Sequence, residues 1–171
     1  VVLVGSWVEY INETGQVLSK YSPPTEEDKI IEFLGSGNIF THSSVIYRKE
    51  AASAVGGYPV QFSYAQDFGL VLELVQKGKL AIIDEYLCKF RLLKGSMTTS
   101  NRYRIDVPKD KIALYKYARQ ILPLSSWARR QNRRIIASNE IQYGIALLRG
   151  NILMALKMIL YGVIRDPTVL L

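Results

Sequence analysis

The 171-residue sequence contains one cysteine, Cys88, and one histidine, His42. A single cysteine excludes an internal disulfide and is consistent with a reducing compartment. Because no Cys-X-X-Cys or His-X-X-X-His pattern occurs, no metal-binding motif is present. The chain also has no glycine loop of the Walker or dinucleotide-binding type and no serine elbow, so it carries no signature of those nucleotide-binding folds or of serine hydrolases.

Long apolar runs are absent as well. The longest, residues 152–164, contains Lys157 and is shorter than the roughly 20 residues that a membrane-spanning helix needs. The first four residues, Val1-Val2-Leu3-Val4, are apolar but have no basic leader, so no signal peptide is predicted. The sequence opens in a strand-like pattern without an initiator methionine, and we expect it to be a piece of a longer protein.

The composition is that of a folded protein, with an uneven distribution of charge. Hydrophobic residues make up 49% of the chain and charged residues 22%, which predicts a domain with a core rather than a disordered chain. Residues 1–100 hold 9 Lys or Arg and 11 Asp or Glu, whereas residues 101–134 hold 10 and 2. We therefore divide the chain into residues 1–100 and a basic C-terminal extension, residues 101–171.

Apolar periodicity and turn signals predict mixed α/β structure up to about residue 100 and helices thereafter. A strand at 1–10 returns through a turn at 12–15, and Thr25 begins a capping box for a helix that Gly35 ends. The other expected elements are strands at 39–47, 80–83 and 86–92, and helices at 48–55, from Asp67 to Lys77-Gly78, at 108–122, from Ser125 or Ser126 to about Leu148, and at 152–164.

Asp67 stands at the start of an apolar helical pattern, residues 68–76, downstream of the glycine pair Gly56-Gly57. Two interpretations of this carboxylate are open. Aspartate is a favoured helix cap, and a carboxylate that faces a cleft can act as a general base. Two adjacent glycines permit positive φ, so they either end the preceding helix or let the backbone approach a ligand closely.

Other candidate residues also have two interpretations. His42 and Ser43 lie in the polar run Thr41-His42-Ser43-Ser44, where they are either structural or hydrogen-bond a substrate. Nearby aromatic side chains either pack in the domain or form a platform on which a sugar stacks; they are Tyr58, Phe62 and Tyr64. The sequence alone does not decide between these alternatives.

The basic segment 101–134 allows three interpretations. Its cations fit an anionic membrane surface, with an apolar side supplied by Ile112, Leu114, Tyr115, Trp127, Ile135 and Ile136. Its arginine pairs and aromatic residues fit nucleic acid, which is the less favoured partner; they are Arg129-Arg130, Arg133-Arg134, Tyr103, Tyr115, Tyr117 and Trp127. The third interpretation is a solvated helical surface whose aromatic side chains are buried.

Several segments, in order along the chain, resemble the second half of a family 2 glycosyltransferase. These are inverting, nucleotide-sugar-dependent enzymes of GT-A fold. The segments are Val2-Leu3-Val4-Gly5-Ser6, Asn38 to Arg48, Val55-Gly56-Gly57-Tyr58, Gln66-Asp67-Phe68-Gly69-Leu70, Ile83-Asp84-Glu85-Tyr86-Leu87, Phe90-Arg91 and Gly95-Ser96-Met97-Thr98.

The resemblance implies an α/β fold in which residues 1–100 form the acceptor-side half of a partial GT-A mixed sheet, followed by a helical extension. It implies transfer of a sugar, with inversion, from a nucleotide-diphosphate donor to a hydroxyl of a saccharide or lipid-linked acceptor. Bacterial cell-surface polysaccharide synthesis at the cytoplasmic membrane face is the expected setting. Asp67 is then the catalytic base, and the implied substrate contacts are Gln66, His42, Ser43, Gly57, Tyr58 and Arg91, the last with Ser96 and Thr98 near the diphosphate.

The chain departs from the family pattern in three ways. The family's N-terminal half, with its Asp-X-Asp metal site, is absent, so Mg²⁺ or Mn²⁺ is expected only for the full-length enzyme and the chain alone is expected to be inactive. Gln66 replaces an acidic residue, and Leu92 follows Arg91 where many relatives carry histidine. The competing hypothesis is a non-catalytic interaction module whose basic helices dock on a membrane or another polyanion.

Overall fold

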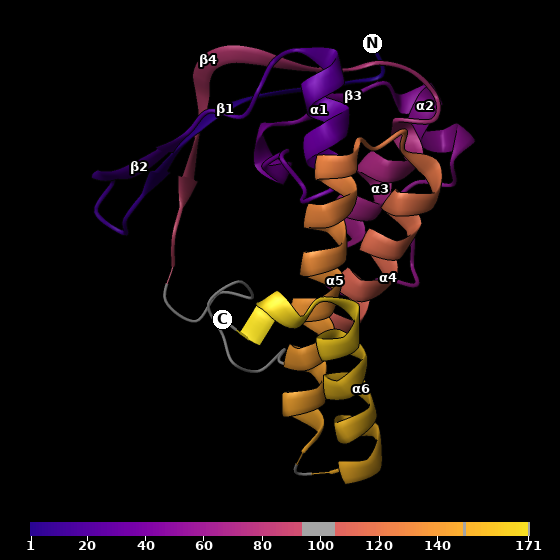
Figure 1. Cartoon of the computed structure of the whole chain (residues 1–171). Coiled ribbons are helices and arrows are strands. Elements are labelled where there is room, and N and C mark those ends of the chain that lie inside the picture. Colours follow the sequence, from indigo (N-terminus) through magenta and orange to yellow (C-terminus); the bar gives the residue numbers. More distant parts are fainter. Residues whose placement is uncertain (94–104, 149, 171) are drawn as a thin grey trace.

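The computed structural model describes residues 1–93, 105–148 and 150–170 (Figure 1). A small sheet and short helices make up the first part, and three longer helices follow. The elements are β1 Leu3–Ile11, β2 Val17–Tyr21, α1 Glu27–Leu34, a 3-10 turn at His42–Ser44, β3 Ile46–Tyr47, α2 Lys49–Ala54, α3 Gln66–Leu74, β4 Leu80–Arg91, α4 Asp106–Ile121, α5 Ser126–Leu147, α6 Ile152–Arg165 and a 3-10 turn at Pro167–Leu170. The mixed α/β class is confirmed, with helices after the sheet as expected.

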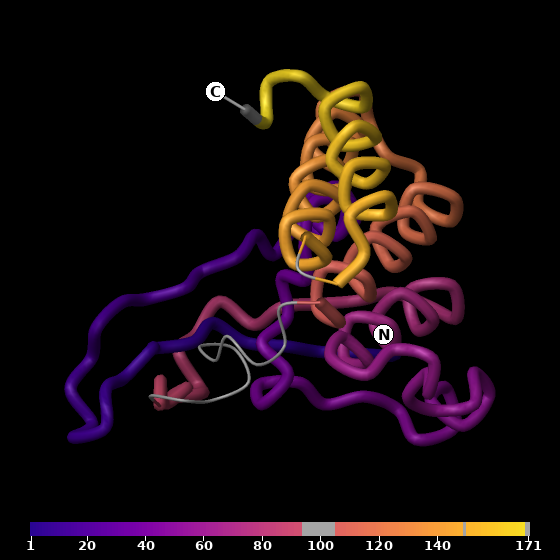
Figure 2. The backbone as a smooth tube through the Cα atoms, turned by 90° about the horizontal axis from the view of Figure 1, so that it is seen from below, coloured from indigo at the N-terminus to yellow at the C-terminus, as the bar shows by residue number. Residues whose placement is uncertain are grey.

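Strand β1 is the centre of the sheet. β4 pairs with it in parallel along its whole length, while β2 and β3 pair antiparallel with its two ends on the other side. The β1–β2 turn is closed by Asn12, whose Oδ1 accepts hydrogen bonds from the backbone N–H groups of Thr14 (3.0 Å) and Gln16 (2.9 Å). The hairpin and the outer half of β4 extend away from the helices (Figures 1 and 2).

The strand expected at residues 39–47 is wrong, because only Ile46 and Tyr47 pair with β1. Ser44 donates to the carbonyl oxygen of Thr41 through both its backbone N–H and its hydroxyl, each at 2.8 Å, and this closes a 3-10 turn. Short polar side chains that bond the local backbone in this way compete with strand pairing. Phe40, 4% exposed, is instead a core residue on a loop.

Three local details also differ from the expectation. Glu26, not Thr25, precedes α1 and makes no side-chain cap bond; it pairs instead with Lys29 at 2.6 Å, so the capping box is wrong. Helix α3 ends at Leu74, three residues before Lys77. The two strand pieces at 80–83 and 86–92 are one continuous strand, β4, with register shifts opposite Trp7.

The helices that follow the sheet share one hydrophobic core with it. Tyr115 of α4 packs its ring 5.5 Å from that of Phe68 on α3. Asn132 of α5 is fully buried and donates through Nδ2 to the carbonyl oxygens of Gly35 (2.8 Å) and Tyr115 (2.9 Å). A Cβ on Gly35 would lie 2.5 Å from Leu124, so the glycine permits this close packing. The change in composition near residue 100 therefore does not coincide with a break in the core.

The C-terminal half of α5 and helix α6 form a hairpin that extends beyond the rest of the molecule (Figure 1). The expected cap at Ser125 is confirmed, because its Oγ accepts from the Ala128 N–H (3.2 Å), and Asn151, for which no cap was predicted, caps α6. A Cβ on Gly162 would lie 2.6 Å from the Ala137 carbonyl oxygen, so only glycine allows the two helices to approach this closely. Within the described residues, no helix has the length and apolar character to cross a bilayer.

Candidate functional site

An open pocket of about 530 Å³ lies between the 3-10 turn at His42–Ser44, the loop that joins α2 to α3, and the start of α3. Its lining brings together residues from three segments: His42, Tyr58, Tyr64, Gln66 and Asp67. Four of these, His42, Tyr58, Gln66 and Asp67, are among the substrate-site residues that the sequence predicted. They are up to 25 positions apart in the chain, so the pocket exists only because the chain folds back on α3.

Asp67 occupies the first turn of α3 without capping it. Ala65 precedes the helix and no side chain bonds its N-terminus, so the interpretation of Asp67 as a cap is wrong. The carboxylate is half-buried, and Asn38 Nδ2 donates to its Oδ2 at 3.4 Å. Asn38 in turn accepts a hydrogen bond from the Phe40 N–H at 3.1 Å, which fixes the loop that carries it. Sequence reasoning missed this contact because Asn38 and Asp67 are 29 positions apart.

Gln66 is exposed at the pocket but is used by the local backbone. The oxygen and nitrogen of its amide are assigned from its neighbours, which are the carbonyl oxygens of Phe62 and Ser63. With the nitrogen facing them, Gln66 donates to both, at 3.2 and 2.9 Å. Gln66 therefore holds the 62–66 turn beside Asp67, and a substrate contact from it stays a prediction.

The hydroxyl of Tyr58 lies within hydrogen-bond distance of two neighbouring side chains, His42 and Tyr47. That oxygen lies 3.3 Å from His42 Nε2 and 3.1 Å from the hydroxyl of Tyr47. The rings of His42 and Tyr58 meet edge to face with centroids 5.6 Å apart. Burial of the hydroxyl, its bond to Tyr47 and the nearby negative charge of Asp67 raise the pKa of Tyr58 to about 12. Tyr58 is therefore a neutral hydrogen-bonding group throughout the physiological pH range.

The glycine pair before Tyr58 has the conformation that the sequence predicted. Gly56 and Gly57 have φ of +81° and +76°, which L-residues with a side chain rarely adopt. Open space surrounds both Cα atoms, so the backbone conformation, and not crowding, requires glycine here. A third glycine was missed: a Cβ on Gly69 would lie 2.5 Å from Pro59, so Gly69 lets the pocket loop lie against α3.

The helical part of the chain also contributes to the pocket. Asp110 of α4 is 7% exposed, and its Oδ2 accepts a hydrogen bond from the backbone N–H of Tyr64 at 2.9 Å. This bond joins the pocket loop to a helix 46 positions further along the chain. Sequence reasoning treated Asp110 as part of a basic surface segment and had no local signal for this contact.

The remaining predicted site residues lie outside the pocket lining. Arg91 donates from Nη1 to the carbonyl oxygens of Asn12 and Glu13, both at 2.9 Å, and so holds the β1–β2 turn. Ser43 is exposed and lies 3.8 Å, oxygen to sulfur, from Cys88 of β4. Gly57 adjoins Tyr58. Ser96 and Thr98 lie outside the described residues, so their contacts with the diphosphate stay a prediction.

In the part of the chain that the structure describes, no three side chains of histidine, cysteine, aspartate or glutamate converge on a possible metal position. These residues therefore do not provide the ligand set for Mg²⁺ or Mn²⁺. The resemblance implies that the metal ligands belong to the N-terminal half of family 2 glycosyltransferases, and this sequence does not contain that half.

Comparison with known proteins identifies no family for this chain. The sequence matches no protein-family model and no curated protein. The residues that line the pocket and the motifs that carry the resemblance are therefore the features that bear on function.

Proposed function

We propose that this chain is the acceptor-side part of an inverting glycosyltransferase, with Asp67 as the general base. The observation that carries the proposal is the placement of Asp67. Its carboxylate lines an open pocket, has one long contact with Asn38, and does not cap the helix that presents it. A half-buried carboxylate held beside an open space of this size can accept a proton from a bound hydroxyl group.

In the proposed reaction, an acceptor hydroxyl in the pocket donates a hydrogen bond to Asp67. Its oxygen attacks the anomeric carbon of the donor sugar as the bond from that carbon to the nucleotide diphosphate breaks. The proton passes to Asp67, and the diphosphate leaves with the bonding electron pair. General-base assistance of this kind contributes roughly 10²–10⁴-fold to rate.

The polar and aromatic wall of the pocket suits a saccharide acceptor. Tyr58 stays protonated at physiological pH, so its hydroxyl can donate or accept a hydrogen bond. His42 contacts that hydroxyl and has a second ring nitrogen for a sugar hydroxyl. Tyr64 adds an aromatic side chain to the same lining, and sugars stack on such faces. These roles belong to side chains of this chain, whereas the resemblance implies that Mg²⁺ or Mn²⁺ is held by residues of the family's N-terminal half.

The test is Asp67→Asn in the complete protein, with Asp28→Asn as the matched control. Asp28 stands at the corresponding position in the first turn of α1, is exposed, and lines no part of the pocket. We expect Asp67→Asn to reduce turnover about 100-fold or more while donor affinity, measured by calorimetry, stays nearly unchanged. Asp28→Asn should keep the parent rate. Unchanged turnover in Asp67→Asn would exclude the base role.

The second candidate function is a non-catalytic module that docks on a membrane or another polyanion. Residues 101–134 carry the cations for it, but four of the six apolar side chains suggested for a membrane contact are in the core and at most 8% exposed: Ile112, Leu114, Tyr115 and Ile136. Ile135 is half-buried, and Trp127 is 47% exposed. Two suggested stacking residues are also engaged, Tyr115 in the core and Tyr117 with Gln76 at 2.9 Å. A protein with its upstream residues restored should bind a nucleotide sugar with Mg²⁺ or Mn²⁺ if it is a transferase, and should not if it is an adaptor.

A further inference from the structure

Helix α6 exposes a stripe of large apolar side chains along its whole length. The stripe consists of Leu153, Leu156, Leu160 and Ile164, which are 83, 56, 57 and 69% exposed. Spacings of three and four residues place these side chains on one side of the helix. We call them the outer face of α6. Lys157 lies in the same stretch, with its amine 5.6 Å from the centroid of the Tyr161 ring.

The opposite side of α6 is packed tightly, so the outer face has a fixed orientation. Ala155 is fully buried, and a Cβ on Gly144 would lie 2.7 Å from its carbonyl oxygen. Gly162 packs equally closely on α5 at the other end. Rotating α6 to bury its outer face would place larger side chains at these close contacts. The exposure therefore follows from the packing of the α5–α6 hairpin.

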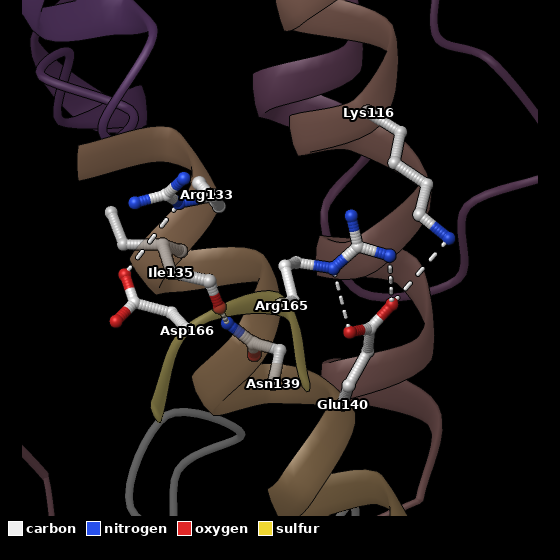
Figure 3. Close-up of polar contacts among 7 residues, drawn as sticks. All are labelled: Lys116, Arg133, Ile135, Asn139, Glu140, Arg165 and Asp166. Atoms are coloured by element: carbon white, nitrogen blue, oxygen red, sulfur yellow. Dashed lines mark hydrogen bonds and ion pairs between the residues drawn. The ribbon is translucent and has the colours of Figure 1, made fainter. Parts of the chain in front are cut away.

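In residues 111–171 the acidic side chains are buried, not exposed. Residues 111–171 contain ten lysines and arginines but only two acidic residues, Glu140 and Asp166, which are 1 and 5% exposed. Figure 3 shows both carboxylates engaged by cations. Arg165 donates to the two oxygens of Glu140 at 2.8 and 2.9 Å, and Lys116 lies 3.6 Å from it.

Asp166 is held in a comparable way. The hydroxyl and backbone N–H of Thr168 donate to its Oδ1 at 2.6 and 3.1 Å, and Arg133 Nε lies 3.8 Å from Oδ2. The Thr168 hydroxyl bond, with the nearby charges of Arg133 and Arg134, keeps the pKa of Asp166 below its ordinary value. Both acidic side chains of residues 111–171 are thus buried and ionically paired, and the exposed charge of the described residues in this stretch is positive.

We propose that the outer face of α6 docks in the plane of an anionic lipid bilayer. An apolar helix face that carries Lys157, in a stretch whose acidic side chains are buried and whose exposed charges are positive, is complementary to acidic headgroups above acyl chains. The 14-residue helix is about 21 Å long, shorter than the roughly 30 Å hydrocarbon layer, so it lies along the surface. Lys157 extends its amine to the headgroups while its stem covers apolar surface.

The same observations disfavour other occupants. A second copy docked on this face would bring Lys157 from each copy to the same apolar surface, with no exposed carboxylate side chain from residues 111–171 to pair with them, which like-charge repulsion opposes. Nucleic acid would satisfy the cations but would leave four large aliphatic side chains against phosphates and water. The proposal does not depend on the glycosyltransferase proposal, because it uses none of the residues that line the pocket.

Vesicle co-sedimentation of the full chain tests the proposal. The parent should bind phosphatidylglycerol vesicles and bind phosphatidylcholine vesicles much more weakly. Leu153→Asp and Leu160→Asp should each weaken binding to the anionic vesicles about tenfold or more. Each replaces a leucine that is buried in the bilayer on docking with a negatively charged side chain. Lys157→Gln should weaken it about fivefold. Leu18→Asp is the matched control, since Leu18 of β2 is also 57% exposed, and it should change nothing.

Folding is checked for each variant by circular dichroism, and all substituted side chains are exposed. Equal binding to anionic and neutral vesicles would contradict the charge argument. Unchanged binding in Leu160→Asp would contradict the assigned face. A dimer in sedimentation velocity that Leu160→Asp dissociates, without vesicle binding by the parent, would show that the face serves self-association. Binding to a single-stranded oligonucleotide but not to vesicles would also overturn the proposal.

Discussion

The α/β part and the helical part of this chain place their carboxylates in opposite environments. Asp67 lines an open pocket, where Asn38 is its one hydrogen-bond partner among the described residues. Glu140 is 1% exposed and is bound by Arg165 and Lys116. A carboxylate that is buried and paired contributes to structure, whereas one that is accessible and weakly held is available for chemistry. Accessibility and pairing, not residue type, therefore separate the candidate catalytic residue from the structural ones.

The two parts also differ in whether their large apolar side chains are buried or exposed. Leu72 and Leu74 of α3 are fully buried beneath the pocket. Leu153 of α6, by contrast, is 83% exposed although the helix is packed on its other side. The first part uses its core to position a pocket, and the hairpin uses close glycine contacts to present a surface. The comparison predicts that substitutions in the two parts will affect different measurements.

The largest expected effect on stability comes from Glu140→Gln. Removing one member of a buried ion pair leaves Arg165 and Lys116 without their carboxylate, and Arg165 is only partly exposed. We expect the free energy of unfolding, from urea denaturation, to fall by about 3 kcal/mol. Asp67→Asn should change it by less than about 0.5 kcal/mol, because Asp67 caps nothing. If Asp67→Asn proved the more destabilising of the two, the contrast between the carboxylates would be wrong.

A smaller effect is expected from Gly162→Ala in the hairpin. The added methyl would lie 2.6 Å from the carbonyl oxygen of Ala137 and from Ile141, so α6 must shift away from α5. We expect a loss of about 2 kcal/mol in the free energy of unfolding, measured in the same way. Gly150→Ala in the α5–α6 turn is the control, because nothing lies within 4 Å of a Cβ there. A loss of equal size in both variants would point to backbone conformation and not to packing.

Signals that lie close together in the sequence predicted structure well. The β1–β2 hairpin, the positive φ of Gly56 and Gly57, the Ser125 cap and the start of α3 beside Asp67 were all predicted from short patterns. Each depends on residues within a few positions of one another, where propensity and capping act. The exceptions include residues 39–47, whose strand propensity was outcompeted by hydrogen bonds from Ser44 to Thr41. The capping box expected at Thr25 was also wrong, because Glu26 precedes α1 and pairs with Lys29.

Contacts between distant residues could not be predicted in the same way. Asn38 beside Asp67, Asp110 beneath Tyr64 and Asn132 between α1 and α4 are polar residues whose roles depend on partners 17 to 97 positions away. A single sequence has no periodicity that reports such pairs. The same limit explains why the composition change near residue 100 indicated a separate extension, whereas the core passes through both parts.

The smallest expected effect concerns the proton on Tyr58, at the rim of the pocket. Its pKa is raised to about 12, chiefly by burial of the hydroxyl and then by the bond to Tyr47. In the unfolded chain a tyrosine loses its proton near pH 10, so the unfolded state is deprotonated first and stability falls as the pH rises from 10 to 12. Tyr58→Phe should make that decline shallower and remove one late step from the ultraviolet titration of tyrosinate.

Tyr47→Phe separates the two causes of this shift. It removes the hydrogen bond but keeps a ring of nearly the same size, so the Tyr58 step should move to lower pH without disappearing. If Tyr58→Phe instead removed a step near pH 10 and left the late part of the curve unchanged, Tyr58 would not ionise late and its hydroxyl would be open to water. The hydroxyl would still be neutral at physiological pH, but the pocket wall would then lack a hydroxyl held in place by Tyr47, even if Asp67 remained accessible.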